Sequence, residues 1–153
     1  MPRQCKLTYS ISGADPIDIS THGFYLVKSD DRVIPPIKKY EEQSYPEHAA
    51  SEIYPYTSYE GFDYSCTLLA VGEYNEVVPK VKAFWDSLFD KTEEPYHAHQ
   101  ITLFNYWKGV QVSGYAMSAE AESSHPRLVE YEKSAFLFNF VIRVSDPTTL
   151  VAL

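Results

Sequence analysis

The sequence of 153 residues predicts a mainly β (α+β) domain: a β-barrel or β-sandwich of about six to eight antiparallel strands with one flanking helix. Several segments alternate apolar and polar residues with a period of two, the pattern of a half-buried strand. Aromatic residues make up 15% of the chain, with 13 Tyr and 8 Phe against 6 Gly, and Tyr and Phe favour strands. The length is that of one domain, so residues 1–153 are expected to form a single unit.

Two strands are expected near the N-terminus. The second covers residues 17–27, after the turn cluster at residues 13–16, and Gly23 within it suggests a bulge or bend. One face of the first strand carries its apolar residues, which are Cys5, Leu7, Tyr9 and Ile11.

Residues 28–60 break the alternation and predict a long loop. The segment contains several prolines and two acidic pairs. It is longer than an ordinary connection, and loops of this length are usually functional or disordered. Its aromatic content argues against disorder. We therefore expect it to lie on its own domain or on a neighbouring subunit, and we interpret its tyrosines as candidate interface residues. These are Tyr40, Tyr45, Tyr54, Tyr56 and Tyr59.

A strand over residues 62–71 leads into the one predicted helix, over about residues 75–90. Apolar residues there recur with a spacing of 3.6, which indicates an amphipathic helix with Phe84 and Trp85 packed on a sheet. Asn75 is a plausible N-cap residue. Pro79 lies within the first helical turn, where its missing N–H breaks no bond.

The remaining strands follow the helix. Residues 99–106 and 110–117 read as a hairpin around a turn at 107–109. Residues 119–133 are polar and fit either a short strand pair or a loop. Residues 136–144 form the most strongly apolar strand, which Asp146-Pro147 ends.

The two cysteines, Cys5 and Cys66, fall on the apolar phase of predicted strands, so we interpret them as buried free thiols. This suits synthesis in a reducing cytoplasm. The N-terminal residues lack the apolar stretch of a signal peptide, and no run approaches the length of a membrane span. We therefore expect no membrane partner.

No motif indicates catalysis, so the chain is not expected to be an enzyme. The nucleophile elbow, the P-loop and the dinucleotide fingerprint are all absent. A net charge of −8 argues against specific nucleic-acid binding. His97 and His99 would share a face of a strand and could bind Zn²⁺ with a third ligand, but we interpret them as part of a solvated loop before a strand. No cofactor or metal is expected.

The order of elements resembles the tail-tube and distal-tail-protein superfamily of tailed bacteriophages, whose fold is shared with type VI secretion tube proteins. The features are two N-terminal strands, the loop at 28–60, a strand leading into a helix, and a final strand. That strand, Phe138-Asn-Phe-Val-Ile-Arg-Val-Ser-Asp-Pro, is similar to the end of distal tail N-terminal domains. So are the segment Ile101-Thr-Leu-Phe-Asn-Tyr-Trp-Lys-Gly and the hairpin through Ser113-Gly-Tyr-Ala-Met.

The resemblance implies a subunit that assembles with itself into a ring, of six copies in this family, as tail tube or distal tail protein of a virion. Its partners would be other tail or baseplate proteins, and DNA would only pass through the lumen. An acidic channel repels phosphates and suits that passage. The alternative is a monomeric β-barrel module that binds a carbohydrate or small ligand through its Tyr and Trp surface. An enzyme with an unrecognised acidic site is a weaker third hypothesis.

Overall fold

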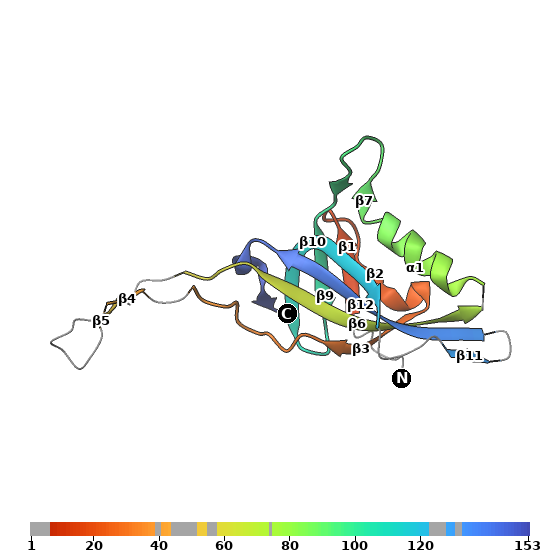
Figure 1. Ribbon diagram of the computed structural model, residues 1–153, viewed down its shortest axis with the longest axis horizontal. Helices are drawn as coiled ribbons and strands as arrows, with labels where there is room; N and C mark the ends of the chain where they lie inside the picture. Colours follow the sequence, from red (N-terminus) through yellow and green to blue (C-terminus); the bar gives the residue numbers. More distant parts are fainter. Residues whose placement is uncertain are drawn as a thin grey trace.

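A computed structural model describes residues 7–38, 41–43, 52–54, 58–73, 75–122, 128–130 and 133–153, the three short ranges by their backbone (Figure 1). The fold is mainly β with one α-helix, as predicted. The helix is α1 (Val77–Asp86), and two 3₁₀ turns are η1 (Ile19–His22) and η2 (Pro147–Thr149). The strands are β1 (Leu7–Ile11), β2 (Ile17–Asp18), β3 (Phe24–Ser29), β4 (Glu41–Gln43), β5 (Glu52–Tyr54), β6 (Phe62–Glu73), β7 (Phe89–Asp90), β8 (His97–Ala98), β9 (Ile101–Asn105), β10 (Val110–Ala121), β11 (Leu128–Glu130), β12 (Lys133–Val144) and β13 (Val151–Ala152).

The main sheet has nine strands, all paired antiparallel. Its order is β2-β1-β9-β10-β12-β6-β3, with β11 beside β12 and β13 beside β10. Because β2 and β3 end this order without pairing to each other, the sheet is open, and the closed barrel among the predicted forms is not what the chain adopts.

Strand β10 joins two halves of the sheet. It pairs with β9 over residues 110–114 and with β12 over residues 115–121, with a bulge at Met117. A strand that passes from one sheet to another makes the corner of a sandwich. Gly114 lies at this corner, and a Cβ there would be 2.5 Å from the Arg143 carbonyl oxygen, so the corner needs a residue without a side chain.

The core lies between the two halves. Strand β12 supplies the residues predicted from its alternation, with Phe138, Phe140, Ile142 and Val144 buried. Strands β1 and β9 supply Leu7, Tyr9, Ile101 and Leu103 from the opposite half. The halves meet directly where the Asn105 side chain of β9 donates a hydrogen bond to the Tyr64 hydroxyl of β6, at 2.9 Å. The predicted sandwich arrangement of alternating inward faces therefore holds.

Helix α1 covers the open side of the core. The Phe84 ring makes edge-to-face contacts with Tyr9, Phe24 and Phe140, at centroid distances of 5.4 to 5.5 Å, which is the geometry that aromatic pairs prefer. The prediction that the helix packs on the sheet is confirmed. Its expected bounds are wrong, since the helix begins at Val77 and ends at Asp86, and Glu76 rather than Asn75 precedes it without a side-chain cap.

One further prediction of local structure needs correction. Residues 17–27 do not form one strand, because Gly23 has φ of 78° and ends the 3₁₀ turn η1 between β2 and β3. A left-handed residue at that point reverses the chain, which an alternation pattern does not reveal. The ambiguous residues 119–133 continue β10 to Ala121 and then supply β11, which forms a hairpin with β12.

Candidate interaction surface

The segment predicted as a loop at residues 28–60 contains a β-hairpin, which we call the arm (residues 36–60). Its strands β4 and β5 pair from Glu41 opposite Tyr54 to Gln43 opposite Glu52. Nearer the body, Ile37 pairs with Tyr59, and the Glu60 N–H donates to the Pro36 carbonyl oxygen at 2.8 Å. The arm leaves the sheet and projects away from it (Figure 1). The predicted long loop therefore contains a short strand pair, at residues 41–43 and 52–54, that the sequence did not indicate.

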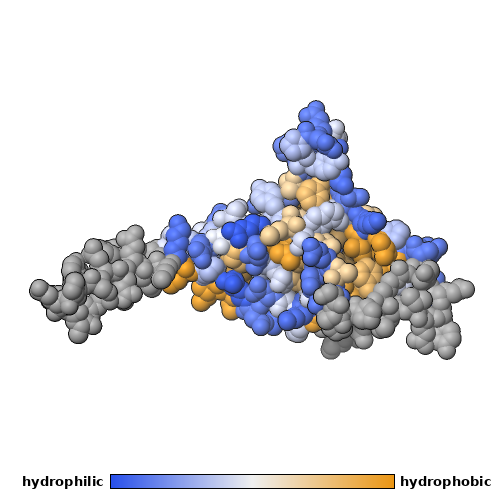
Figure 2. All heavy atoms as spheres, in the orientation of Figure 1, coloured by the Kyte–Doolittle hydropathy of each residue, from blue (hydrophilic) through white to orange (hydrophobic). Residues whose placement is uncertain are grey.

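Apolar side chains are exposed where the arm leaves the body. Val33 and Ile34 are 64% and 66% exposed, and Ile37 and Tyr59 are each 46% exposed. Apolar atoms gather at the base of the arm in Figure 2. A contiguous apolar patch on a projecting element is typical of a protein interface. We call these four residues the arm-root patch.

The tyrosines proposed as interface residues have different outcomes. Tyr59 lies in the arm-root patch and is exposed, as an interface residue of a free subunit should be. Tyr54 ends β5, and the structure describes its backbone only. Tyr40, Tyr45 and Tyr56 lie outside the described residues. Val33, Ile34 and Ile37 were missed, although their apolar run beside Pro35 and Pro36 could have indicated an exposed apolar segment.

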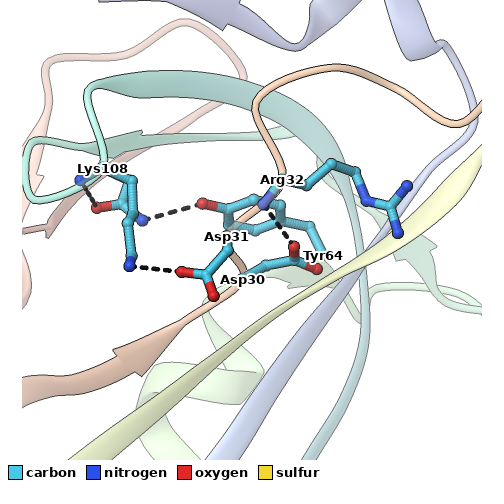
Figure 3. A network of polar contacts seen from close by, with 6 residues as sticks. Asp30, Asp31, Arg32, Tyr64 and Lys108 are labelled. Carbon is cyan, nitrogen blue, oxygen red and sulfur yellow. Dashed lines mark hydrogen bonds and ion pairs between the residues drawn. The ribbon is translucent and has the colours of Figure 1, made fainter.

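A polar network ties the chain before the arm to the body (Figure 3). The Lys108 ammonium lies 2.5 Å from an Asp31 carboxylate oxygen and 4.7 Å from the centroid of the Trp107 ring. The Asp31 pKa is lowered because Lys108 donates a hydrogen bond to it and carries the opposite charge. One residue later, the Arg32 guanidinium lies over the Phe62 ring at 5.0 Å.

The network has a buried end at Asn105. Its amide nitrogen donates to the Tyr64 hydroxyl, and its amide oxygen accepts from the Lys108 N–H at 3.0 Å. Asn105 and Tyr64 are both fully buried, and burial raises the pKa of Tyr64 to about 12. A buried amide that makes these bonds fixes the turn after β9 and therefore the position of Lys108. In the sequence, Asn105 shares its face of the strand with Ile101 and Leu103, which was the available signal.

A second surface lies between α1 and β10. It is a groove of about 420 Å³, bounded on one side by the partly buried Trp85 and on the other by Met117, which is 55% exposed. Its remaining lining residues are Val81, Lys82, Asp86, Ser118, Ala119 and Glu120. A second hollow, of about 660 Å³, lies on the outer face of β3, β6 and β12, with Asp30, Asp31 and Glu122 on its lining.

The other candidate residues do not assemble into a site. His97 lies in β8 and His99 beyond the end of that strand, so the two do not share one strand as the spacing predicted. Within the described ranges, no three His, Cys, Asp or Glu side chains are grouped to hold a metal ion. Cys66 is a buried free thiol, as predicted, and burial raises its pKa to about 12. Cys5 lies outside the described residues.

Comparisons with known proteins leave the family open. Neither the models of protein families nor the curated proteins include a match to this chain. Across the parts of the chain that the structure describes, no helix is long and apolar enough to span a membrane.

Proposed function

We propose that the chain is a structural subunit that assembles with copies of itself into a ring or tube of a phage or phage-like tail. The observation that carries this proposal is the arm, a projecting hairpin with an exposed apolar root on a rigid sheet body. A two-stranded hairpin has marginal stability by itself in water, so an arm of this kind gains from a partner surface. The predicted resemblance to tail-tube and distal tail proteins supplies the class of assembly.

The body supports the same proposal through the network at the arm root. The ion pair between Asp31 and Lys108 and the buried Asn105 hold the departing chain against the turn after β9. An arm with a fixed point of departure presents its apolar root in a defined direction, and this lowers the entropy lost on docking. The arm therefore suits a repeated contact between subunits.

The charge of the chain agrees with a lumen through which DNA passes. The net charge of −8 repels phosphates, so nucleic acid would slide without being retained. Other tail or baseplate proteins would be the further partners, and the virion tail would be the location after synthesis in the bacterial cytoplasm.

The proposal is tested by the mass and shape of the purified full chain. Light scattering over a range of concentrations, followed by electron microscopy of the largest species, should show closed rings with a central hole or stacks of them. A monomer at every concentration would contradict the proposal.

A ligand-binding module is the second candidate, and one observation favours it. The turn after β9 exposes Tyr106 by 53% and Trp107 by 46%, and exposed aromatic rings can stack on sugars. A monomer that binds saccharides, with loss of binding in Trp107→Ala, would support this alternative. Saccharide binding by an assembled ring would not distinguish the two functions, so the mass is measured first.

A further inference from the structure

We infer that the groove between α1 and β10 is the docking site for the arm of a second copy of this chain, through strand addition to the free edge of β10. The inference rests on the proposed assembly and names the surface that receives the arm. The receiving edge comprises residues 118–121, which follow the bulge at Met117.

The edge of β10 is open over these residues. In the described part of the chain, Ala119 and Ala121 have ladder partners only in β12, which lies on the other side of the strand. The Glu122 N–H donates to the Leu137 carbonyl oxygen of β12 at 2.9 Å. Backbone groups alternate in direction along an antiparallel strand. The N–H and C=O groups of Ala119 and Ala121 therefore point toward the open edge.

Strands β2 and β3, which end the sheet order, are less suited to strand addition. Strand β2 has only two residues and runs into the turn η1. Strand β3 is interrupted by an irregularity between Leu26 and Lys28, and a bulge with a lysine is a common protection of an edge strand. Strand β10 also carries a bulge, at Met117, but its free edge continues beyond that bulge over residues 118–121.

The groove supplies a wall as well as an edge. The Trp85 ring lies 6.5 Å from Phe140 in an edge-to-face arrangement, and Phe140 pairs with Ala119. Trp85 therefore stands beside the small side chain of Ala119, with room for an apolar side chain from an added strand. An edge strand flanked by a helix is a surface that recognises extended segments by main-chain hydrogen bonds and side-chain pockets.

Geometry and charge favour the arm as the occupant. The arm leaves one end of the molecule, whereas α1 and the distal part of β10 lie toward the other end (Figure 1). An arm at the opposite end of the molecule does not reach the groove of its own copy. Because each copy offers one arm and one groove, neighbouring copies make a head-to-tail contact, and contacts of this kind close into rings.

The charge of the arm also fits the groove. Residues 36–60 contain five glutamates and two lysines, a net charge of −3. In the groove, Asp86 is paired with Lys91 at 2.6 Å, and the exposed Glu120 lies on the β10 side. On the α1 side, Lys82 is the one cation of the lining and has no ion-pair partner among the described residues. Lys82 is therefore the cation that faces an acidic arm, and we expect it to guide the arm into the groove.

A photocrosslinking experiment tests the inference on the full chain. Met117 is replaced by benzoylphenylalanine, and a matched variant carries the same group at Tyr25, which is 48% exposed on β3. Mixing isotopically light and heavy copies identifies crosslinks between subunits. We expect position 117 to crosslink to residues 41–54 of another copy and position 25 not to do so.

Each outcome separates this inference from the proposed function. Assembly with a crosslink between position 117 and the arm supports both. Assembly with position 117 linked elsewhere, or not linked at all, overturns the docking site and leaves the ring intact. Monomers at every concentration overturn the proposed function and the docking site together.

A pair of charge reversals gives a second readout. Lys82→Glu should raise the concentration for half-assembly by about tenfold or more, since it places like charges together. The matched control is Lys80→Glu, on the same helix but outside the groove lining, which should change that concentration by less than about twofold. Equal effects of the two reversals, with both variants folded, would contradict the docking site.

Discussion

The body and the arm use aromatic residues in opposite ways. In the body, β6 and β12 pair along twelve residues each, and Phe138 and Phe140 of β12 are buried against helix and sheet. In the arm, the paired strands β4 and β5 have three residues each, and Tyr59 at the root is half exposed. The body is stabilised by contacts within one chain. The described part of the arm is held by short backbone pairing, which is the condition expected of an element that docks on another molecule.

The largest loss of stability should come from truncating a buried side chain in the core of the body. Phe140→Ala removes a fully buried ring that contacts Phe84 and Trp85, and it should lower the free energy of unfolding by about 3–5 kcal/mol. Phe138→Ala should behave in the same way. Urea denaturation measures the loss, with Tyr25→Ala as an exposed control that changes stability by about 0.5 kcal/mol or less. A loss below about 1 kcal/mol for both core variants would show that this face is not the core.

A smaller loss is expected where the body meets the arm root. Asn105→Ala leaves the buried Tyr64 hydroxyl and the Lys108 N–H without their partner, which should cost about 1–3 kcal/mol. Asn139→Ala is the matched control, because Asn139 accepts a hydrogen bond from Thr67 in a partly buried pair on the outer face. Equal losses in the two variants would mean that Asn105 has no special role in the network.

The pH dependence of stability should reveal a partly buried histidine in the body. The His22 ring lies 2.6 Å from the Tyr9 hydroxyl and near the Phe24 and Phe84 rings. Burial lowers the pKa of His22 below its usual value of 6.5. The unfolded chain therefore binds the proton more readily, so this contribution to stability is complete above pH 6.5 and is lost as the pH falls below it.

Denaturation at pH 7.5 and pH 5.5 measures this contribution. His22→Gln should reduce the difference in stability between the two pH values, whereas His97→Gln should leave it unchanged because His97 is exposed. A pH dependence that is the same in His22→Gln and the natural chain would contradict the assignment.

The smallest effect concerns the thiols, which we predict to be buried, reduced and dispensable. In a Cys5→Ser variant, only Cys66 can react, and it should label only on unfolding, because the side chain is buried and its pKa is raised to about 12. Cys66→Ala should still fold. Rapid labelling of the native variant would place Cys66 at the surface.

The sequence allowed much of the body to be predicted, because alternation reports which face of a strand is buried. The last strand was predicted in this way. The sandwich corner was not, since the bulge at Met117 and the switch of partner in β10 depend on contacts between strands distant in sequence. The same reason explains why Gly23 was interpreted as a bulge within a strand rather than as the end of η1.

The candidate site was predicted only in outline. The length and the tyrosines of residues 28–60 predict an interface, and the structure places Tyr59 on an exposed patch. The hairpin was missed, because strands of three residues are too short for a period of two to stand out. The ion pair between Asp31 and Lys108 joins residues 77 positions apart, and the groove beside β10 exists only once α1 is packed. Neither leaves a local pattern in the sequence.

The role of the arm is tested most directly by removing it and measuring both folding and mass. Pro36 and Glu60 lie next to each other, joined by a backbone hydrogen bond of 2.8 Å, so a short Gly/Ser linker can replace residues 37–59 without strain. The Asp31–Lys108 pair and the Arg32–Phe62 contact remain. We expect a variant that unfolds cooperatively with nearly the stability of the full chain and has the mass of a monomer where the full chain forms rings. A folded variant that assembles like the full chain would contradict the account, and a variant that fails to fold would place the arm in the core of the domain.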